Sequence, residues 1–83
     1  MEQVTIFGRA SCGFCTRAIQ LCEINDFHYR YVDIEVEGIS KQDLSQTIGK
    51  PVFTVPQIFV GDEHVGGFDH FSAYLARAGA ALN

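Results

Sequence analysis

The pattern that most constrains the fold is a helix flanked by two short strands near the start of the chain. Val4–Phe7 is a β-type run that ends at Gly8. Apolar residues then recur at positions 15, 18, 19 and 22, which is the spacing of one face of an α-helix. From Phe27 to Ile34, aromatic and polar residues alternate as in a half-exposed strand. A helix between two strands predicts a βαβ unit with a parallel strand pair and a right-handed crossover.

Turn and cap residues predict the elements that follow. Ser40 and Asp43 have the spacing of a capping box for a second helix, which Gly49 and Pro51 would end. The run Gln57–Val60 is typical of a strand covered on both faces.

The end of the chain predicts a hairpin and a third helix. Gly61 and Asp62 have the composition of a two-residue turn, and residues 63–66 would form the returning strand. Asp69 is expected to cap the last helix. The buried face of that helix is predicted to hold Phe71, Tyr74, Leu75, Ala78 and Leu82. The order β-α-β-α-β-β-α predicts an α/β fold with a mixed four-stranded sheet.

Length and composition exclude several classes of protein. The 83 residues are expected to form one domain, residues 1–83, and the hydrophobic share of 47% excludes a disordered chain. No apolar run approaches the roughly 20 residues of a membrane span, and no secretory signal is expected at the start, so the predicted location is the cytoplasm. The net charge of −4 argues against nucleic acid as a partner, because phosphates call for a basic face.

Three cysteines carry the most informative chemistry. Cys12 and Cys15 form a C-x-x-C motif, and Cys22 stands alone. In a reducing compartment such a motif indicates redox chemistry or half of a metal site. A structural zinc site needs four ligands and the chain has no second C-x-x-C, so no metal is expected. Cys22 is predicted to be a small buried core residue. The three histidines are scattered and are expected on the surface.

The position of the motif at a helix start predicts different roles for its two thiols. Cys12 would lie at the cap, where unpaired N–H groups and the helix dipole stabilise a thiolate, and Arg9 and Arg17 would add to that positive field. Cys15 would lie one turn further, on the protected apolar face. We therefore expect Cys12 to attack a disulfide and Cys15 to release the product by closing a Cys12–Cys15 disulfide.

Two later segments have features of a binding site. Val55 precedes Pro56 and is therefore expected to be extended. If the bond is cis, the Val55 backbone is free to pair with an extended ligand, but the sequence leaves the isomer open. Gly66-Gly67 either lets a ligand approach the backbone or is a plain turn. The helix start at Asp69 suits a carboxylate.

Together these segments resemble the glutaredoxins, most closely the small bacterial dithiol glutaredoxin-1 type that serves ribonucleotide reductase. C-x-x-C is shared by all thioredoxin-like proteins, whereas T-V-P followed by G-G at this separation is far more specific. The resemblance implies a thioredoxin fold with sheet order 2-1-3-4 flanked by three helices, a cis-proline at Pro56, and re-reduction by glutathione. The matching stretches are Val4–Arg9, Cys12–Cys15, Tyr31–Ile34, Glu37–Ile39, Gly49–Val52, Thr54–Val60 and Val65–Gly67.

The resemblance also implies roles for individual residues near the motif. Cys12 is the nucleophile and Cys15 the resolver. Arg9 matches the basic residue that faces the glycine carboxylate of glutathione, and Phe14 takes the place of the aromatic residue beside the thiol.

Further implied glutathione contacts lie in the second half of the chain. Thr54 and Val55, next to Pro56, match the segment whose backbone pairs with the cysteinyl part of glutathione. The start of the last helix matches the part that holds the γ-glutamyl end, through Gly67, Phe68, Asp69 and His70.

Two departures from the family pattern are visible. Dithiol members more often have Pro-Tyr between the cysteines, whereas this chain has Gly13-Phe14. Gly-Phe is the pair of monothiol glutaredoxins, which ligate a [2Fe–2S] cluster, but the extra loop and the Trp-Pro pair of that class are absent from the sequence. Close relatives often have Thr-Asp where Asp69-His70 stands, so the carboxylate has moved by one position.

The sequence therefore predicts a monomeric, glutathione-dependent thiol-disulfide oxidoreductase with no resident metal. Its expected partners are glutathione and disulfide-containing or glutathionylated proteins, with ribonucleotide reductase among them, and neither nucleic acid nor a membrane. Two alternatives remain open at this point. One is a scaffold or carrier for a glutathione-ligated [2Fe–2S] cluster. The other is a reductant fed by thioredoxin reductase.

Overall fold

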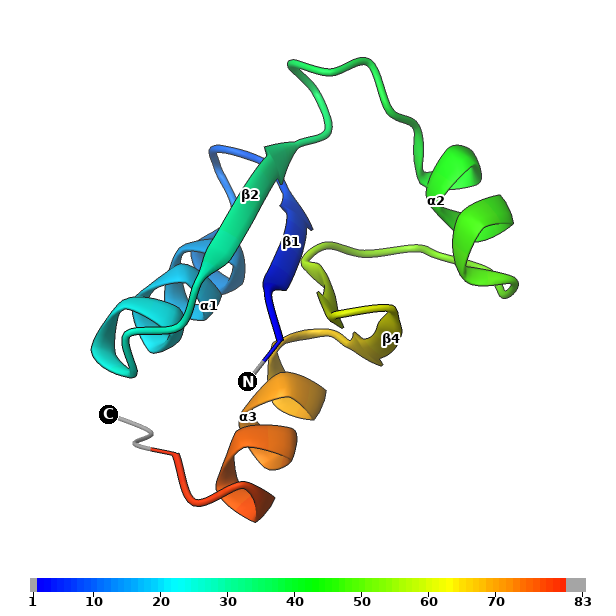
Figure 1. The fold of residues 1–83 in the computed structure, drawn as a ribbon. Helices are drawn as coiled ribbons and strands as arrows, with labels where there is room; N and C mark the ends of the chain where they lie inside the picture. Colours follow the sequence, from blue (N-terminus) through cyan, green and yellow to red (C-terminus); the bar gives the residue numbers. More distant parts are fainter. Residues whose placement is uncertain (1, 81–83) are drawn as a thin grey trace.

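The computed structural model describes residues 2–80, and within them the order of elements is the predicted one. Figure 1 shows the strands at the centre of the molecule and the helices around them. The elements are β1 (Val4–Gly8), α1 (Gly13–Ile24), β2 (Tyr29–Asp33), α2 (Lys41–Ile48), β3 (Gln57–Val60), β4 (Glu63–Gly66) and α3 (Phe68–Arg77).

The four strands of the described chain form one mixed sheet in the order β2-β1-β3-β4, as the resemblance implied. β1 is parallel to β2 and antiparallel to β3, so that Ile6 lies between Tyr31 and Ile58. β3 and β4 are antiparallel and joined by a two-residue turn, in which Gly61 has the positive φ of 57° that the predicted hairpin requires. The register therefore places the carboxyl end of β1, and the loop after it, next to the start of β3.

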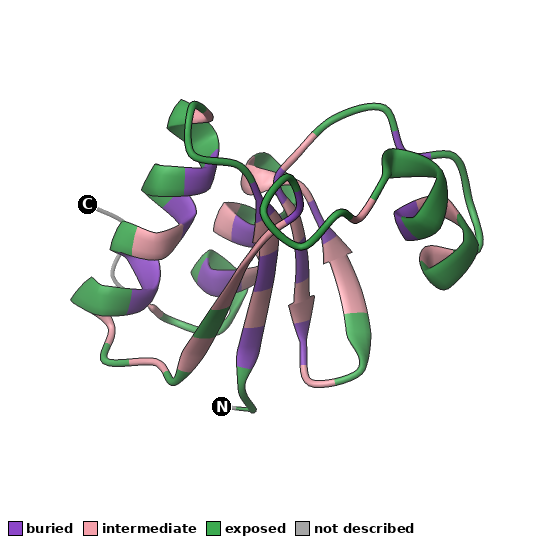
Figure 2. Cartoon of the chain, turned by 90° about the horizontal axis from the view of Figure 1, so that it is seen from above, coloured by how far each residue is buried: buried purple, intermediate pink, exposed green. Residues whose placement is uncertain are grey.

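The main core lies between the sheet and the α1 and α3 helices. α2 packs on the other side of the sheet, over a smaller cluster of Ile34, Leu44 and Val52 (Figures 1 and 2). The main core consists of Val4, Ile6, Ala18, Leu21, Cys22, Ile58, Val60, Phe71 and Leu75.

The expectation that β3 is covered on both faces was wrong. Ile58 and Val60 are buried, but Gln57 and Phe59 are only half-buried. The reason is that α2 has eight residues and covers only part of that face of the sheet. This half-open face leaves room for the concavity described below.

Helix capping matches the prediction at α2 but not at α3. Ser40 and Asp43 form the predicted capping box, with both hydrogen bonds at 2.9 Å. At α3 the N-cap is Gly67, and Asp69 lies inside the first turn, so the prediction that Asp69 caps the helix was wrong. The β3–β4 hairpin ends at Gly66, directly before the cap, so α3 begins two residues earlier than it would with Asp69 as the N-cap.

The residues buried on α1 and α3 also differ in detail from those that the helical periodicity predicted. In α1, Leu21 is buried and Ile19 only partly so. In α3, Phe71 and Leu75 are fully buried, whereas Ala78 is exposed because it is the C-cap, where the helix ends. Residue 82, which was predicted to lie on the buried face of α3, is outside the described residues. β2 is shorter than the predicted strand at both ends.

Candidate active site

Cys12 is the N-cap of α1, as predicted. Its Sγ accepts a hydrogen bond from the backbone N–H of Cys15 at 3.2 Å, and its carbonyl accepts one from the N–H of Thr16 at 3.2 Å. The thiol is half-buried. A sulfur at this position faces the unpaired N–H groups of the first helical turn.

Cys15 lies one turn into α1 and is 1% exposed. Burial, helped by a hydrogen bond with the Cys12 side chain, raises the pKa of the Cys15 thiol to about 12. A Cβ placed on Gly8 would lie 2.6 Å from the Cys15 sulfur, so only glycine at the end of β1 leaves room for it. Cys15 is thus a protonated thiol held directly behind Cys12.

Cys22 is a core residue, as predicted. It is fully buried in the main cluster between α1 and the sheet. Burial, with a smaller contribution from Glu23, raises the pKa of its thiol to about 12. All three cysteines are free thiols in this structure.

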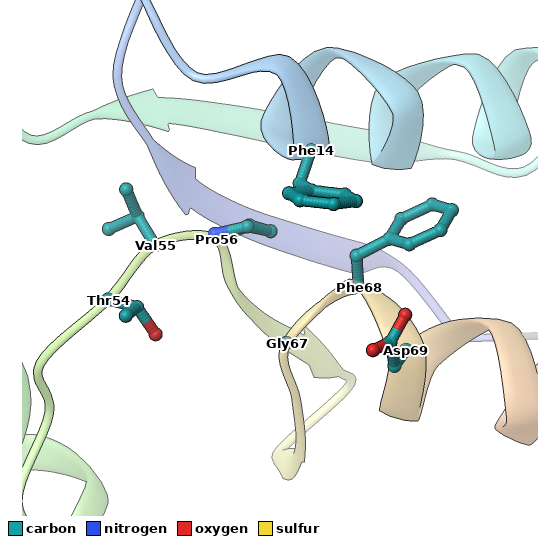
Figure 3. Close-up of a pocket in the computed structure, with 7 residues that line it drawn as sticks. All are labelled: Phe14, Thr54, Val55, Pro56, Gly67, Phe68 and Asp69. Carbon is teal, nitrogen blue, oxygen red and sulfur yellow. The ribbon is translucent and has the colours of Figure 1, made fainter.

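A groove of about 250 Å³ opens beside the motif (Figure 3). The peptide bond between Val55 and Pro56 is cis. The carbonyl of Val55 accepts a hydrogen bond from the Cys12 thiol at 3.6 Å, which joins segments 43 positions apart. Three separate parts of the chain line the groove with Phe14, Thr54, Val55, Pro56, Gly67, Phe68 and Asp69.

Two aromatic rings that line this groove lie against the guanidinium group of Arg17. The rings of Phe14 and Phe68 lie side by side, with centroids 5.7 Å apart and planes tilted by 34° (Figure 3). The guanidinium of Arg17 lies 5.7 Å from the Phe14 centroid and 5.0 Å from that of Phe68. Cation–π contact of this kind restrains both rings. Sequence reasoning missed this role, although the three-residue spacing of Phe14 and Arg17 on one helix could have indicated it.

The sequence of this site matches a known family. The glutaredoxin family model matches residues 4–65, a range that contains the C-x-x-C motif and the cis-proline segment. The chain belongs to the glutaredoxin family.

Relatives of this glutaredoxin extend over nearly its whole length. It is 53% identical to glutaredoxin 1 of Escherichia coli over 78 residues, which is 88% of this chain and 92% of the relative. Its fold is similar to the structure of reduced E. coli glutaredoxin, with a TM-score of 0.78 and 51% identity over 90% of this chain and 94% of that one. A buckwheat glutaredoxin–glutathione complex is similar at a TM-score of 0.73 and 28% identity, over 92% of this chain and 69% of that one.

These likenesses establish the class of chemistry. The thioredoxin fold is confirmed, and this glutaredoxin is a thiol-disulfide oxidoreductase whose redox-active pair is Cys12 and Cys15. The geometry agrees with that class, because an accessible sulfur at a helix cap lies next to a buried, protonated one.

The glutaredoxin places two of the candidate glutathione contacts outside the groove. Arg9 is exposed in the loop after β1, where its carbonyl accepts a hydrogen bond from the Cys12 N–H at 3.2 Å. His70 does not line the groove but a neighbouring concavity, which also contains His64 and Lys50. The three histidines were expected to be scattered surface residues, but the fold brings two of them together and half-buries His64.

Two features are absent from residues 2–80 of the glutaredoxin. No group of three His, Cys, Asp or Glu side chains in this range is placed to hold a metal ion. No helix in the same range is both long and apolar enough to cross a bilayer.

Proposed function

We propose that this glutaredoxin reduces protein disulfides and glutathione mixed disulfides, and that glutathione returns its Cys12–Cys15 pair to the dithiol form. The observation that carries the proposal is the position of Cys12, at the helix N-cap and in hydrogen-bond contact with Val55 at the edge of the groove. The buckwheat glutaredoxin–glutathione complex among similar structures supports glutathione as the ligand.

The first step is attack by the Cys12 thiolate on a substrate disulfide. A new bond forms between the Cys12 sulfur and one substrate sulfur, the substrate S–S bond breaks, and the other sulfur leaves as a thiolate that takes a proton from water. Ionised Cys12 no longer donates to the Val55 carbonyl, which then becomes available to an N–H group of the bound substrate.

The second step uses Cys15. As its thiol attacks the Cys12 sulfur, its proton passes to the departing substrate sulfur, so that the Cys12–Cys15 disulfide forms and the substrate leaves as a thiol. Because its pKa is raised to about 12, Cys15 stays protonated at neutral pH and does not compete with Cys12 for the first attack. The contact between the two side chains keeps the second attack intramolecular.

Glutathione then restores the dithiol in two exchanges. The thiolate of one glutathione attacks the Cys12 sulfur, forming a Cys12–glutathione mixed disulfide and freeing Cys15. A second glutathione attacks the sulfur of the bound one, which releases oxidised glutathione and the Cys12 thiolate. Reduction of a glutathionylated protein needs only Cys12, since a single exchange transfers the glutathione.

Groups in and beside the groove support glutathione as the ligand. Glutathione is an extended peptide with a carboxylate at each end. The backbone of Val55 suits its central cysteinyl residue, the N-terminus of α3 at Gly67 suits the γ-glutamyl carboxylate, and Asp69 suits the γ-glutamyl ammonium. Arg9, three positions before Cys12, is the cation proposed for the glycine carboxylate.

Coupled assays with two reducing systems test this proposal. Oxidised protein is supplied with NADPH, glutathione and glutathione reductase, or with NADPH and thioredoxin reductase, and NADPH oxidation is followed with a small disulfide as substrate. We expect turnover in the first system and little in the second. Turnover with thioredoxin reductase alone would instead establish the thioredoxin-like alternative.

The likeness to E. coli glutaredoxin 1 supports a narrower proposal about the protein partner. We propose ribonucleotide reductase as one disulfide substrate, reached in the cytoplasm by a monomer, because a glutathione-fed dithiol needs a reducing compartment. The test is deoxyribonucleotide formation by oxidised reductase when this protein, glutathione, glutathione reductase and NADPH are its only reductant. No product above the control without the protein would refute this partner.

The surroundings of Gly13 favour a second candidate function. A Cβ at Gly13 would meet nothing within 4 Å, so the surface beside Cys12 has room for a second chain. A [2Fe–2S] cluster would be held there by Cys12 of two chains and two glutathiones, and would store or carry iron and sulfide. Anaerobic purification with glutathione tests this, because a brown dimer that Cys12→Ser abolishes would establish the cluster. A colourless monomer after reconstitution would refute it.

A further inference from the structure

A second concavity, of about 370 Å³, lies next to the disulfide groove and shares Thr54 and Gly67 with it. In Figure 3 the Thr54 side chain points away from the Phe14 ring of the groove. The basic and titratable residues that line this concavity are Lys50, His64 and His70, and no Asp or Glu is among the described residues lining it. We call it the basic concavity. Its positive character contrasts with the net charge of −4 of the chain.

Hydrogen bonds connect the floor of the basic concavity to the disulfide groove. The side-chain amide of Gln57 donates to the carbonyl of Thr54 at 3.0 Å, so its Oε1 faces the Nε2 of His64 at 2.7 Å. His64 therefore carries a hydrogen on Nε2, and its ring is further restrained by Phe59, 5.1 Å away. The segment that presents Val55 to a substrate is thus tied to a side chain of the basic concavity.

Lys50 and His70 act on the titration of His64 in the basic concavity. Burial lowers the pKa of His64, and the nearby charges of Lys50 and His70 lower it further. The two histidines each have an acidic neighbour in sequence, but Asp69 lines the disulfide groove and Glu63 lines a separate pocket. An anion in the basic concavity would therefore meet the ammonium group of Lys50 with no carboxylate among the described lining residues, beside the point where a substrate pairs with Val55.

We propose that the basic concavity binds a carboxylate of the polypeptide substrate, from an aspartate or glutamate beside the reacting cysteine. This inference rests on the proposed function and adds a preference among its protein substrates. A chain that pairs with Val55 runs past Thr54 and Gly67, which the groove and the basic concavity share. A neighbouring acidic side chain then lies within reach of Lys50.

Two peptides with an internal disulfide, which differ only in aspartate or asparagine next to the attacked cysteine, test this proposal. Pre-reduced protein is mixed with each peptide and the single-turnover rate is measured, so that re-reduction by glutathione plays no part. We expect the parent to react with the acidic peptide about two- to fivefold faster at limiting peptide concentration, as for an exposed ion pair. The preference should shrink in high salt.

Variants of Lys50 supply the decisive comparison. Lys50→Gln should remove most of the preference and Lys50→Glu should reverse it, whereas both should keep the parent's rate with the neutral peptide. Lys41→Gln is the matched control, because Lys41 is an exposed lysine at the other end of α2 and does not line the basic concavity. It should keep the preference.

Two results would overturn the inference. One is an unchanged preference in Lys50→Gln. The other is a rise in the KM for glutathione in Lys50→Gln with no change in peptide preference, which would assign the concavity to glutathione itself. Loss of glutathione-coupled turnover in the parent would refute the proposed function, and the single-turnover preference would still decide this inference.

Discussion

The Cys12 thiol donates a hydrogen bond to the carbonyl oxygen of Val55, at a sulfur–oxygen distance of 3.6 Å. The bond connects the start of α1 with the segment before β3, which are adjacent because β1 and β3 pair in the sheet. It places the nucleophile at the edge of the groove and occupies the carbonyl that a substrate would use. The Val55 oxygen can therefore accept a hydrogen bond from a substrate only when the Cys12 thiol no longer donates to it.

The two thiols of the motif should fail in different ways when replaced. Cys12→Ser should abolish all thiol transfer, because the sulfur that meets the substrate is gone. Cys15→Ser should keep removal of glutathione from mixed disulfides, which needs one thiol, and lose most reduction of internal protein disulfides. The measurements are a glutathionylated-peptide assay and an insulin-reduction assay. Full activity of Cys12→Ser in either assay would refute the assignment.

Loss of a charged contact with glutathione should raise the KM for a glutathionylated substrate. Arg9→Ala and Asp69→Ala are each expected to raise the KM for a glutathionylated peptide about fivefold, since an exposed charged contact is worth on the order of 1 kcal/mol. The effect should diminish in high salt. Arg30→Ala is the matched control, because Arg30 is an exposed arginine that pairs with Thr5 near the start of β1, whereas Arg9 and Cys12 follow the end of that strand. If Arg9→Ala and Asp69→Ala behaved like this control, the proposed glutathione contacts would be wrong.

A larger residue at Gly8 should lower the stability of the protein, because there is no room for a Cβ beside the buried Cys15 thiol. In Gly8→Ala the new Cβ would lie 2.6 Å from the Cys15 sulfur and 3.2 Å from the Tyr31 ring, so Cys15 or β1 must move. We expect a loss of about 1–3 kcal/mol in the free energy of unfolding, as for overpacked cores. Dithiol turnover should fall more than single-thiol turnover.

Gly13→Ala is the control for this substitution, because a Cβ there meets nothing within 4 Å. Alanine also favours a helix by about 1 kcal/mol over glycine, so Gly13→Ala should retain or raise stability. Equal stability of Gly8→Ala and Gly13→Ala in urea titrations would show that the contact with Cys15 is unimportant.

Stability should decline in alkaline solution because of the buried thiols. The pKa of Cys22 is raised from 9.0 to about 12 on folding, so its contribution is complete below about pH 9 and is lost as the pH rises toward 12. One group changes the free energy of unfolding by at most about 1.4 kcal/mol per pH unit in that interval. Cys22→Ala removes this group, and it should also lower stability by about 1 kcal/mol at neutral pH through lost packing.

The pH effect is measured as the difference between parent and Cys22→Ala in urea titrations from about pH 8 to about pH 10. The other titrating groups, including Cys15 and Tyr31, cancel in this difference. We expect the parent's advantage to shrink as the pH rises. A constant difference would mean that the Cys22 thiol ionises equally in the folded and unfolded chains. Glutathione-dependent turnover of Cys22→Ala should match the parent, and its loss would refute the core assignment.

Local signals in the sequence predicted the elements well. The order of strands and helices, the capping box of Ser40 and Asp43, and the placement of Cys12 at a helix start were confirmed. Each depends on residues within a few positions of one another, through helix periodicity, strand alternation or a side chain that bonds the backbone three residues on. The sheet order was implied by the family resemblance rather than by these patterns.

Where elements meet, local signals were insufficient. The sequence predicted Asp69 as the cap of α3, whereas the cap is Gly67, because the hairpin before the helix fixes where it begins. On α1 the periodicity predicted Ile19 as a buried residue, but Leu21 is buried instead. The reason is that the positions of the sheet and α3 decide which face of the helix is covered.

The sequence by itself determined the chemistry of this protein, because a C-x-x-C at a helix start creates an accessible thiol and a protected one within a single turn. Only the tertiary structure decided what surrounds that chemistry. Val55 reaches Cys12, and Arg17 reaches Phe68, through pairing of β1 with β3 and packing of α1 beside α3. Such contacts join residues far apart in the chain, and their energies come from burying a shared core rather than from any local pattern.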